Sequence, residues 1–539
     1  RVAARSPRGT MSVPDETSLR AAFDAAGQSH VFKHWDKCSL DERASLLQQL
    51  SEIDLDFVTS VFTRSMRDHT NGVSSNGAIE PVVPDADASD SDNAGKWHRA
   101  GLKAAKNGEL AVVLLAGGQG TRLGSSAPKG MYDIGLPSGR TLFQLQCERL
   151  LKLTKMAEEL VVEGDDDDQD TNPEPGDPEP KVKVTVPLYV MTSPFTHRET
   201  KHYFESHDFF GLPKESVAFF LQGWLPCFSE EPGEEPGGDD KTKTGKILMK
   251  SKHEIATAPD GNGGVYKALE LNGCIDDMTK KGVKHVYAYC VDNAAVQVGD
   301  PTFVGFCALN GFQAGAKVIK KAYPDEPVGV FTRRDGKVHV VEYSEMPDDL
   351  NTAVDESGNL KFDAANVVLH YYSLAFLKKC CDLRGEVQSE LAYHVARKQI
   401  PSVSDDGDAT ETPQENNGVK LEAFIFDVYA FCDSVGFLNG TRGIDFAPVK
   451  NKEGTGKDSP DTARQILSTL HRKWIENAGG AVSGDETSPI EVAPAVSFDG
   501  NDVAFKEFVN GKSFATGSCL ETNSWILSKA VGAGSRKRA

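Results

Sequence analysis

Apolar positions repeat with two different periods along the chain. In the first hundred residues they recur about every 3.6 positions, as in SLRAAFDAAGQ (18–28) and DERASLLQQLSEID (41–54), where acidic residues stand near the start of the pattern. This spacing and these acidic starts are typical of amphipathic helices. An irregular polar stretch follows at about 70–93. We therefore predict a mostly helical N-terminal domain over residues 1–105.

Short apolar runs then alternate with helical patterns. The runs are AVVLLAGG (111–118), VPLYVMTS (186–193), VAFFLQG (217–223) and KHVYAYCVDN (284–293). Between them lie amphipathic stretches such as TLFQLQCERLLKLTKMAEEL (141–160) and VYKALELNGCIDDMTKKG (265–282). Continuous apolar runs are typical of buried parallel strands, and their alternation with helices predicts a doubly wound α/β sheet.

Two further patterns complete the layout. PVGVFTRRDGKVHVVEYSE (327–345) contains Asp335-Gly336 between two apolar stretches, which predicts a β-hairpin. From about residue 445 onward the patterns weaken, as in a small α+β domain. We therefore predict a central domain over 106–440 and a small C-terminal domain over 441–539.

The acidic charge is concentrated in low-complexity segments. The 539 residues carry 59 basic and 79 acidic side chains, a net charge of −20. Segments 163–180 and 230–240 hold fifteen of the acids and no base, which leaves a net charge of −5 on the rest. Segments so polar and rich in Pro and Gly, with 402–418 as a third, are expected to be solvated loops, or else docking sites for a basic partner. The acidic balance disfavours nucleic-acid binding.

The composition excludes several other classes of protein. No stretch reaches the roughly 18–20 apolar residues that a membrane span requires. The ten cysteines and thirteen histidines form no CxxC pair, HExxH motif or Cys/His cluster, so we expect no structural zinc site. Cysteines without a disulfide framework, and no apolar signal region, predict a cytoplasmic location.

The most informative motif follows the first apolar run. LAGGQGTRLG (115–124) contains four glycines and is followed closely by Pro128-Lys129-Gly130. Glycines let backbone N–H groups approach phosphate oxygens, and Arg122 and Lys129 add positive charge beside them. The spacing fits neither GxxxxGK[ST] nor GxGxxG, which disfavours a P-loop protein and a dinucleotide-dependent oxidoreductase. The pattern predicts a site for a polyphosphate.

A carboxylate ends a later apolar run. Asp292 lies in YCVDN, and the C-terminal end of a central strand faces the ligand crevice of an open α/β sheet. Mg²⁺ favours such oxygen ligands together with substrate phosphates, so Asp292 is the metal candidate, with Mn²⁺ as the alternative ion. The other interpretation of Asp292 is a helix N-cap for the next segment.

The glycine-rich segment also resembles a known signature. LAGGQGTRLGSSAPKGMYDIGLPSGRTLFQLQCERL (115–150) is similar to sugar-nucleotide pyrophosphorylases, and most of all to the eukaryotic UDP-N-acetylhexosamine pyrophosphorylase family. The resemblance continues, in order, through FFLQGWLPC (219–227), APDGNGGVYKAL (258–269), YCVDN (289–293), PVGV (327–330), VVEYSE (340–345), DAAN (363–366), KLEAFIFDV (420–428) and FAPVKN (446–451). It implies a Rossmann-like, GT-A-like nucleotidyltransferase as the central domain.

The resemblance implies a uridylyltransferase. UTP and N-acetylglucosamine 1-phosphate would give UDP-N-acetylglucosamine and pyrophosphate, through in-line attack of the sugar phosphate on the α-phosphorus. Such crowding of negative charge requires preorganised positive groups, and by resemblance Arg122 and Lys129 are the catalytic residues. Two alternatives are a broad-specificity UDP-sugar pyrophosphorylase and a non-catalytic nucleotide-sugar-binding protein. No nucleic acid or membrane is expected as a partner.

The resemblance also assigns binding residues. The nucleotide-binding residues that it implies are Leu115, Ala116, Gly117, Gly118, Gln222, Gly261, Asp292 and Lys420. The sugar-binding residues that it implies are Asn262, Gly329, Glu342, Tyr343, Asn366, Phe424, Phe426 and Lys450. Within these sets, Gln222 and Gly261 resemble positions that read the uracil ring.

Some of these assignments depend on the resemblance alone. DGNGG (260–264) by composition is a plain turn, and Lys420 and Lys450 taken singly are ordinary surface lysines. One residue departs from the family pattern, because Ala365 stands where a glycine is expected before Asn366. The phosphate contacts are therefore better supported by the sequence than the sugar contacts.

Overall fold

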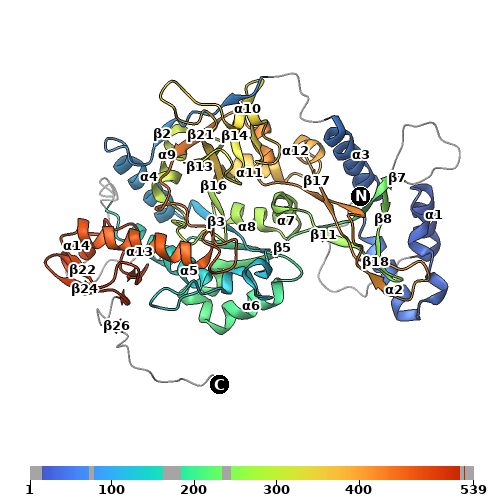
Figure 1. The fold of residues 1–539 in the computed structure, drawn as a ribbon, viewed down its shortest axis with the longest axis horizontal. Coiled ribbons are helices and arrows are strands. Elements are labelled where there is room, and N and C mark those ends of the chain that lie inside the picture. The colour runs from blue at the N-terminus through green and yellow to red at the C-terminus, as the bar shows by residue number, and fades with distance from the viewer. Residues whose placement is uncertain (1–14, 72–77, 162–183, 233–244, 522–526, 529–539) are drawn as a thin grey trace, which may run out of the picture. The chain divides into compact units, whose positions relative to one another are not determined.

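The computed structural model describes residues 15–71, 78–161, 184–232, 245–521 and 527–528. The chain forms two compact units, and the elements of both are labelled in Figure 1. Unit 1 comprises residues 1–76, 223–264 and 390–427, and unit 2 comprises residues 77–222, 265–389 and 428–539. The three predicted domains are consecutive along the chain, whereas each of these units is built from separated segments. The three-domain division stays a prediction. The acidic segment 163–180 lies outside the described residues, as does most of 230–240.

Unit 2 is organised around a mixed sheet in which most neighbouring strands are parallel. The order across the sheet is β2 (Ala86–Asp87), β21 (Val435–Asn439), β13 (Ala314–Lys320), β16 (Ala364–Ser373), β12 (His285–Cys290), β3 (Leu110–Leu115), β4 (Leu188–Thr192) and β5 (Val217–Leu221). Every pair on this path is parallel except the two made by β16, which runs antiparallel to β13 and β12. The predicted α/β fold with a parallel-rich central sheet is confirmed.

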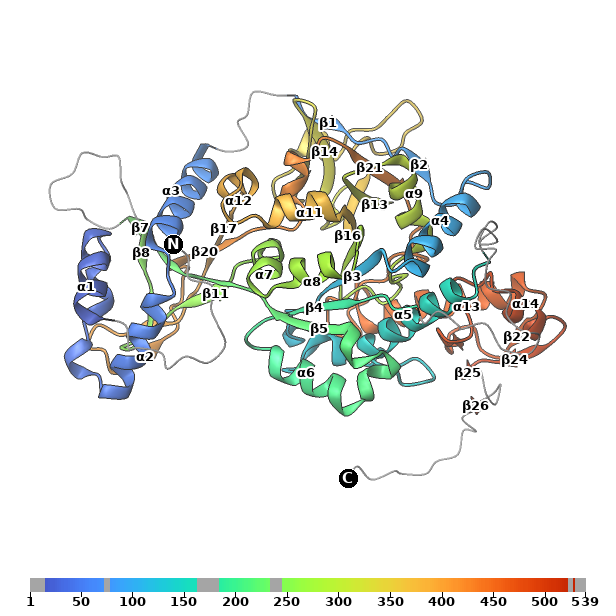
Figure 2. The same cartoon turned by 180° about the vertical axis from the view of Figure 1, so that it is seen from behind.

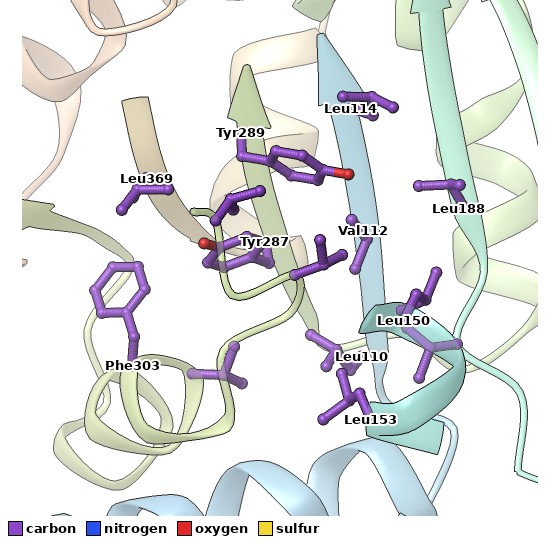
Figure 3. Packing of buried hydrophobic residues seen from close by; sticks show 14 of the residues in the cluster. Leu110, Val112, Leu114, Leu150, Leu153, Leu188, Tyr287, Tyr289, Phe303 and Leu369 are labelled. Carbon is purple, nitrogen blue, oxygen red and sulfur yellow. The ribbon is translucent and has the colours of Figure 1, made fainter. Parts of the chain in front are cut away.

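Helices cover both faces of this sheet. The helices on one face include α4 (Ala94–Lys106), α5 (Leu142–Glu158), α6 (His197–Ser206) and α9 (Pro301–Asn310), and those on the other face include α7 (Val265–Leu271) and α8 (Cys274–Lys280). On the first face, Leu110, Val112 and Leu114 of β3 pack with α5 and α9 (Figure 3). On the second, the Tyr189 hydroxyl of β4 donates to Asp277 of α8 at 2.7 Å.

Two local predictions have different outcomes. The hairpin turns where predicted, between β14 (Val330–Arg334) and β15 (Lys337–Val341), and its two turn residues both have positive φ, which matches a type I′ turn. The helical pattern over 265–282 was read as one stretch, but the structure divides it into α7 and α8. Gly273 between them adopts φ +70°, a left-handed conformation that ends a helix.

Unit 1 packs the N-terminal helices on a small antiparallel sheet. Its helices are α1 (Glu16–Ala25), α2 (Leu40–Ser51) and α3 (Leu55–Asn71). Its main sheet has the order β17 (His394–Lys398), β20 (Gly418–Glu422), β7 (Phe228–Pro232) and β8 (Gly245–Ile247). Its short pairs are β6 (Trp224–Pro226) with β11 (Thr257–Pro259) and β9 (Met249–Ser251) with β10 (Glu254–Ile255). The sequence explains the helix starts, since Asp15 and Ser39 cap α1 and α2.

The third acidic segment is better ordered than its composition suggests. Residues 402–418 were expected to be a solvated loop, but β18 (Ser402–Val403) and β19 (Thr410–Glu411) form a short hairpin there. Lys33 and Lys37 of unit 1 pair with Asp405 at 3.0 Å and Asp408 at 3.4 Å. These exposed pairs contribute little stability individually, so the hairpin is a surface feature.

The last part of unit 2 contains both helices and short strands (Figure 2), and the predicted separate C-terminal domain stays a prediction. It contains α13 (Pro460–Asn477), β22 (Ala481–Ser483), β23 (Glu491–Val492), α14 (Val503–Val509), β24 (Ser513–Ala515), β25 (Ser518–Leu520) and β26 (Leu527–Ser528). All ten cysteines of the chain are free thiols. Within the described ranges, no helix has the length and apolarity needed to cross a bilayer.

Candidate active site

The glycine-rich loop leaves β3 at the carboxyl edge of the sheet in unit 2. Its start continues the sheet pairing, because the Ala116 N–H donates to Met191 at 2.8 Å. The loop then folds back, with the Lys129 N–H donating to Gly118 at 3.2 Å. Gly118 and Arg122 are exposed at its outer side. The loop therefore presents open backbone and one guanidinium group to an anionic ligand.

Two of the predicted nucleotide residues lie directly against one another. Gln222 follows β5, is 8% exposed, and donates its backbone N–H to Thr192 at 2.8 Å. A Cβ atom built on Gly117 would lie only 2.7 Å from the Gln222 side-chain oxygen. A residue larger than glycine at position 117 would therefore have to displace the end of the Gln222 side chain.

Asp292 is positioned beside the loop by the parallel pairing of β12 with β3. The Val291 N–H donates to Leu115 at 3.1 Å, and the carboxylate of Asp292 lies 3.6 Å from the Lys129 ammonium group. The helix N-cap interpretation is wrong, because the next helix, α9, begins only at Pro301 and is capped by Asp300. The structure therefore brings the metal candidate and one catalytic candidate together.

Buried side chains from α5 hold the segment that carries Asp292. The Gln146 amide donates to the Val291 carbonyl at 3.0 Å. Arg149 donates to Ala294 at 2.7 Å and to Val296 at 3.1 Å. Burial lowers the pKa of Arg149 to about 10, which still leaves the guanidinium group charged at neutral pH. The sequence pattern predicted α5 but did not reveal these three hydrogen bonds.

Lys450 reaches the same edge from a distant part of the chain. The Val449 N–H donates to the Asp292 carbonyl at 2.8 Å, which places segment 446–450 alongside the end of β12. Burial raises the pKa of the Cys290 thiol and Asp292 adds to this, while Lys450 and Lys129 oppose it. Lys450 and Lys129 therefore both lie within electrostatic range of the Cys290 thiol, at the end of β12 that carries Asp292.

Asn293 and a buried charge cluster hold segment 441–450 in place. The Asn293 oxygen accepts from the Ala447 N–H at 3.0 Å, and its amide donates to the Asp445 carbonyl at 2.7 Å. The ammonium group of Lys317 lies 2.5 Å from Asp300 and 2.6 Å from Asp445. Burial alone would lower the pKa of Lys317, but these two carboxylates outweigh it and raise the pKa. These positioning residues were missed by sequence reasoning.

Three predicted sugar residues gather elsewhere in unit 2. The Asn366 N–H donates to the Gly329 carbonyl at 2.8 Å. A Cβ atom on Gly329 would lie 2.7 Å from a carboxylate oxygen of Glu342, so a larger residue there would displace the end of that side chain. Tyr343, another predicted sugar residue in unit 2, is 55% exposed.

The other five predicted residues belong to unit 1. Gly261 has φ +86°, and a Cβ there would lie 2.2 Å from the Ala423 carbonyl oxygen. The Asn262 oxygen accepts from the Ile425 N–H at 2.9 Å, which ties the DGNGG turn to segment 420–428. Phe424 contacts Phe426 with ring centroids 5.1 Å apart. Lys420 lies on β20 near Cys227, whose pKa is raised to about 11 by burial, with Lys420 opposing.

Comparison with known proteins identifies the family of the chain. The profile of the family described as UTP–glucose-1-phosphate uridylyltransferase matches residues 55–514. The chain belongs to this family. UDP-N-acetylglucosamine diphosphorylase 2 of Arabidopsis thaliana is 39% identical over 498 residues, 90% of each chain. UDP-N-acetylglucosamine pyrophosphorylase of Saccharomyces cerevisiae is 36% identical over 500 residues, 90% of this chain and 96% of the relative.

A solved structure extends the similarity to the fold. The uridine diphosphate N-acetylglucosamine pyrophosphorylase of Trypanosoma brucei, in complex with an inhibitor, matches with a TM-score of 0.73 and 29% identity. The match covers 95% of this chain and 99% of the trypanosomal chain. The resemblance drawn from the glycine-rich segment is therefore confirmed, and this uridylyltransferase-family member has relatives named for UDP-N-acetylglucosamine along nearly its whole length.

Replacing Gly117 by alanine is expected to raise the KM for UTP by about 5–30-fold, the effect of losing one specific polar contact. The added Cβ would displace the Gln222 amide, and we expect the preference for UTP over CTP to fall with it. Steady-state kinetics with both nucleotides measures the two effects. Gly118→Ala is the matched variant, because its Cβ meets nothing within 4 Å. Equal loss of base preference in both variants would contradict a specific role for the Gly117–Gln222 contact.

Proposed function

We propose that the protein catalyses the reaction of UTP with N-acetylglucosamine 1-phosphate to give UDP-N-acetylglucosamine and pyrophosphate. The observation that carries the proposal is the glycine-rich loop with Lys129 beside Asp292 in a chain whose relatives are named for this product. The phosphate oxygen of the sugar attacks the α-phosphorus of UTP, and the bond from that phosphorus to pyrophosphate breaks in line.

The proposed mechanism assigns electrostatic roles to the residues of the loop. The backbone from Leu115 to Gly118 binds the phosphates, because open glycine N–H groups suit phosphate oxygens. Arg122 stabilises the charge that develops on the leaving pyrophosphate, and Lys129 lies at the phosphates that are being joined. Lys450, in the segment that pairs with the end of β12, adds a further positive charge. No covalent intermediate on the protein is needed, since orientation and charge stabilisation account for the catalysis.

The arrangement of unit 2 supports a finer statement about the fold. We propose that its sheet, with helices on both faces, is a doubly wound, GT-A-like nucleotidyltransferase domain. In such sheets the ligand lies outside the carboxyl ends of the strands, which is where the glycine-rich loop and Asp292 are found. The cytoplasmic location and the lack of nucleic-acid or membrane partners stay predictions.

Asp292 is suited to hold Mg²⁺ together with substrate phosphates. Within the described residues, no three His, Cys, Asp or Glu side chains gather as a metal site. The half-buried carboxylate of Asp292 alone fits Mg²⁺ nonetheless, because this ion is usually held by one or two carboxylates plus phosphates and waters. When bound, Mg²⁺ or Mn²⁺ would neutralise phosphate charge. The 3.6 Å contact with Lys129 keeps the carboxylate at the loop without such an ion.

Asp292→Asn is expected to raise the Mg²⁺ concentration for half-maximal rate by about tenfold or more, since it removes one anionic ligand and preserves shape. A Mg²⁺ titration of both proteins at saturating UTP measures this. Asp133→Asn, an exposed carboxylate two residues after η4 (Lys129–Met131), is the control. Superimposable titration curves for Asp292→Asn and the unmodified protein would assign Asp292 a structural role only.

The proposed function is tested by pyrophosphate release from UTP with three sugar 1-phosphates. We expect N-acetylglucosamine 1-phosphate to be used about 10–200-fold better than glucose 1-phosphate, because Phe424 and Phe426 are proposed to bury the acetyl methyl group. N-acetylgalactosamine 1-phosphate keeps that group and is expected to be used nearly as well. Equal use of glucose 1-phosphate would favour the broad-specificity enzyme, and no release with any sugar would favour the non-catalytic binding protein.

A further inference from the structure

Strand β16 contains a conformation that its sequence does not favour. Val368 has φ +56°, which is rare for a β-branched residue because its side chain crowds the backbone there. The pairing with β13 shifts at this point, since Ala316 pairs with His370 but Val318 pairs with Asn366. Three residues of β16 therefore lie opposite one residue of β13, as in a β-bulge. Strain of this kind is often found beside functional residues, and here it lies two positions from Asn366.

The bulge fixes which end of the Asn366 amide points inward. The Val368 N–H lies 3.1 Å from the Asn366 side-chain oxygen. A backbone N–H can only donate a hydrogen bond, so the atom that it faces must be the acceptor of the amide. The opposite orientation would place two donors against each other. The chemistry of this one contact thus removes the usual ambiguity between amide oxygen and nitrogen.

The orientation of Asn366 determines the tautomer of His370. The Nε2 atom of His370 lies 3.0 Å from the same Asn366 oxygen. Because that oxygen can only accept, Nε2 must carry the proton and Nδ1 must be the acceptor. Nδ1 lies 3.2 Å from the Tyr372 hydroxyl, which therefore donates to it, and the Tyr266 hydroxyl donates to Tyr372 at 3.0 Å. The direction of every hydrogen bond in this chain follows from the Val368 N–H.

The side chains in this series of hydrogen bonds are buried and stay neutral. His370 and Tyr266 are 0% exposed, whereas Asn366 is 8% exposed at the end of the chain. Burial lowers the pKa of His370 to about 3. Burial also raises the pKa of Tyr266 well above its usual value. No member changes its charge at physiological pH, so the direction of the hydrogen bonds is constant.

We propose that His370 is a positioning residue that presents the Asn366 amide nitrogen as a hydrogen-bond donor to the sugar phosphate, and so selects a sugar oxygen that acts as acceptor. The Asn366 oxygen already accepts from Val368 and His370, so the amino group is the part of the side chain left to meet a ligand. The proposal rests on the proposed function, because it assigns the ligand at this position to the sugar substrate. It adds a specificity rule: the sugar group that faces Asn366 needs a lone pair and does not need a proton.

The rule can be tested on the unmodified protein with analogues of N-acetylglucosamine 1-phosphate. At carbons 3, 4 and 6 in turn, the hydroxyl is replaced by hydrogen or by fluorine, which accepts a hydrogen bond weakly but cannot donate one. We expect one position at which the deoxy analogue loses at least tenfold in kcat/KM while the fluoro analogue loses less than about fivefold. Equal losses for both analogues at every position would overturn the proposal.

Variants test the part played by His370. Asn366→Asp keeps both inward contacts but presents an oxygen to the sugar, so the fluoro analogue should lose its advantage and the KM for sugar phosphate should rise at least tenfold. His370→Phe removes the donor and should raise the same KM, with the KM for UTP changed less than about threefold, and His370→Gln should restore part of the loss. A rise in both KM values together, or no rescue by glutamine, would mean that His370 only supports the fold.

A substrate-free measurement separates this proposal from the proposed function. The ¹⁵N resonances of His370, assigned by their loss in His370→Gln, report which ring nitrogen carries the proton. The Nε2–H tautomer, unchanged between pH 6 and 8, is expected. The Nδ1–H tautomer or a charged ring would overturn the positioning role even if N-acetylglucosamine 1-phosphate is the substrate. Conversely, the expected tautomer in a protein that does not use this sugar would leave the hydrogen-bond chain correct and the proposed function wrong.

Discussion

Arg122→Ala is expected to lower kcat for UDP-N-acetylglucosamine formation by about 100–1,000-fold, the usual cost of removing one preorganised electrostatic contact in a transition state. Arg122 stands exposed in η3 (Thr121–Leu123), at the turn of the glycine-rich loop. Arg122 is proposed to act where pyrophosphate departs, so the binding of UDP-N-acetylglucosamine should weaken much less than the rate falls. Steady-state kinetics and calorimetric binding of the product, on the same preparations, measure the two effects.

The matched control is Arg384→Ala, which removes an equally exposed guanidinium group from the turn after α11 (Leu374–Cys381). It should leave kcat within about twofold. Arg122→Lys keeps the positive charge but lacks the planar guanidinium group with its paired donors, so its kcat should lie between those of Arg122→Ala and the unmodified protein. A change in kcat below threefold for Arg122→Ala would remove this residue from the catalytic machinery.

Lys317→Met is expected to lower the free energy of unfolding by about 3–5 kcal/mol, because it leaves two buried carboxylates without their cation. Lys317 is 3% exposed, and both Asp300 and Asp445 depend on it for charge compensation. Urea unfolding followed by circular dichroism measures the loss. Because segment 441–450 is held through Asp445, we also expect the KM for UTP to rise.

Lys320→Met is the control for stability, since Lys320 is exposed at the end of the same strand and should change stability by less than about 0.5 kcal/mol. A deficit below about 1 kcal/mol for Lys317→Met would contradict the uncompensated-charge explanation.

The sequence predicted the elements whose residues interact locally or follow one period. The strand before the glycine-rich loop, the helix over 141–160 and the turn at Asp335-Gly336 were all found where expected. Gln222 and Asp292 were placed at strand ends by the resemblance and by the rule for open sheets, and the structure puts each beside the loop. These features depend on apolar periodicity, turn residues and motifs, which can be recognised in a single sequence.

Other features depend on contacts between distant residues, and no local pattern reveals them. Arg149 occupies a position in an amphipathic helix where a charged residue would be taken as solvent-exposed, yet it is 9% exposed and holds the Asp292 segment. Lys317 likewise lies in an apolar strand without any nearby acid in sequence. The orientation of the Asn366 amide group could not be predicted, because it follows from a bulge in the backbone of β16. Unit 1 was also missed as a unit, because three separated segments form it.

The joining of segment 446–450 to the end of β12 has a consequence for biosynthesis. Gly118 and Lys129 are made early, but Lys450 is translated 158 residues after Asp292. At about 5–20 residues per second, a ribosome needs roughly 8–30 s to cover that interval. During this time the nascent chain already contains the glycine-rich loop and lacks the segment that pairs with the end of β12. The edge of the sheet at Asp292 should therefore be completed, and turnover should begin, only after residue 450 has left the exit tunnel.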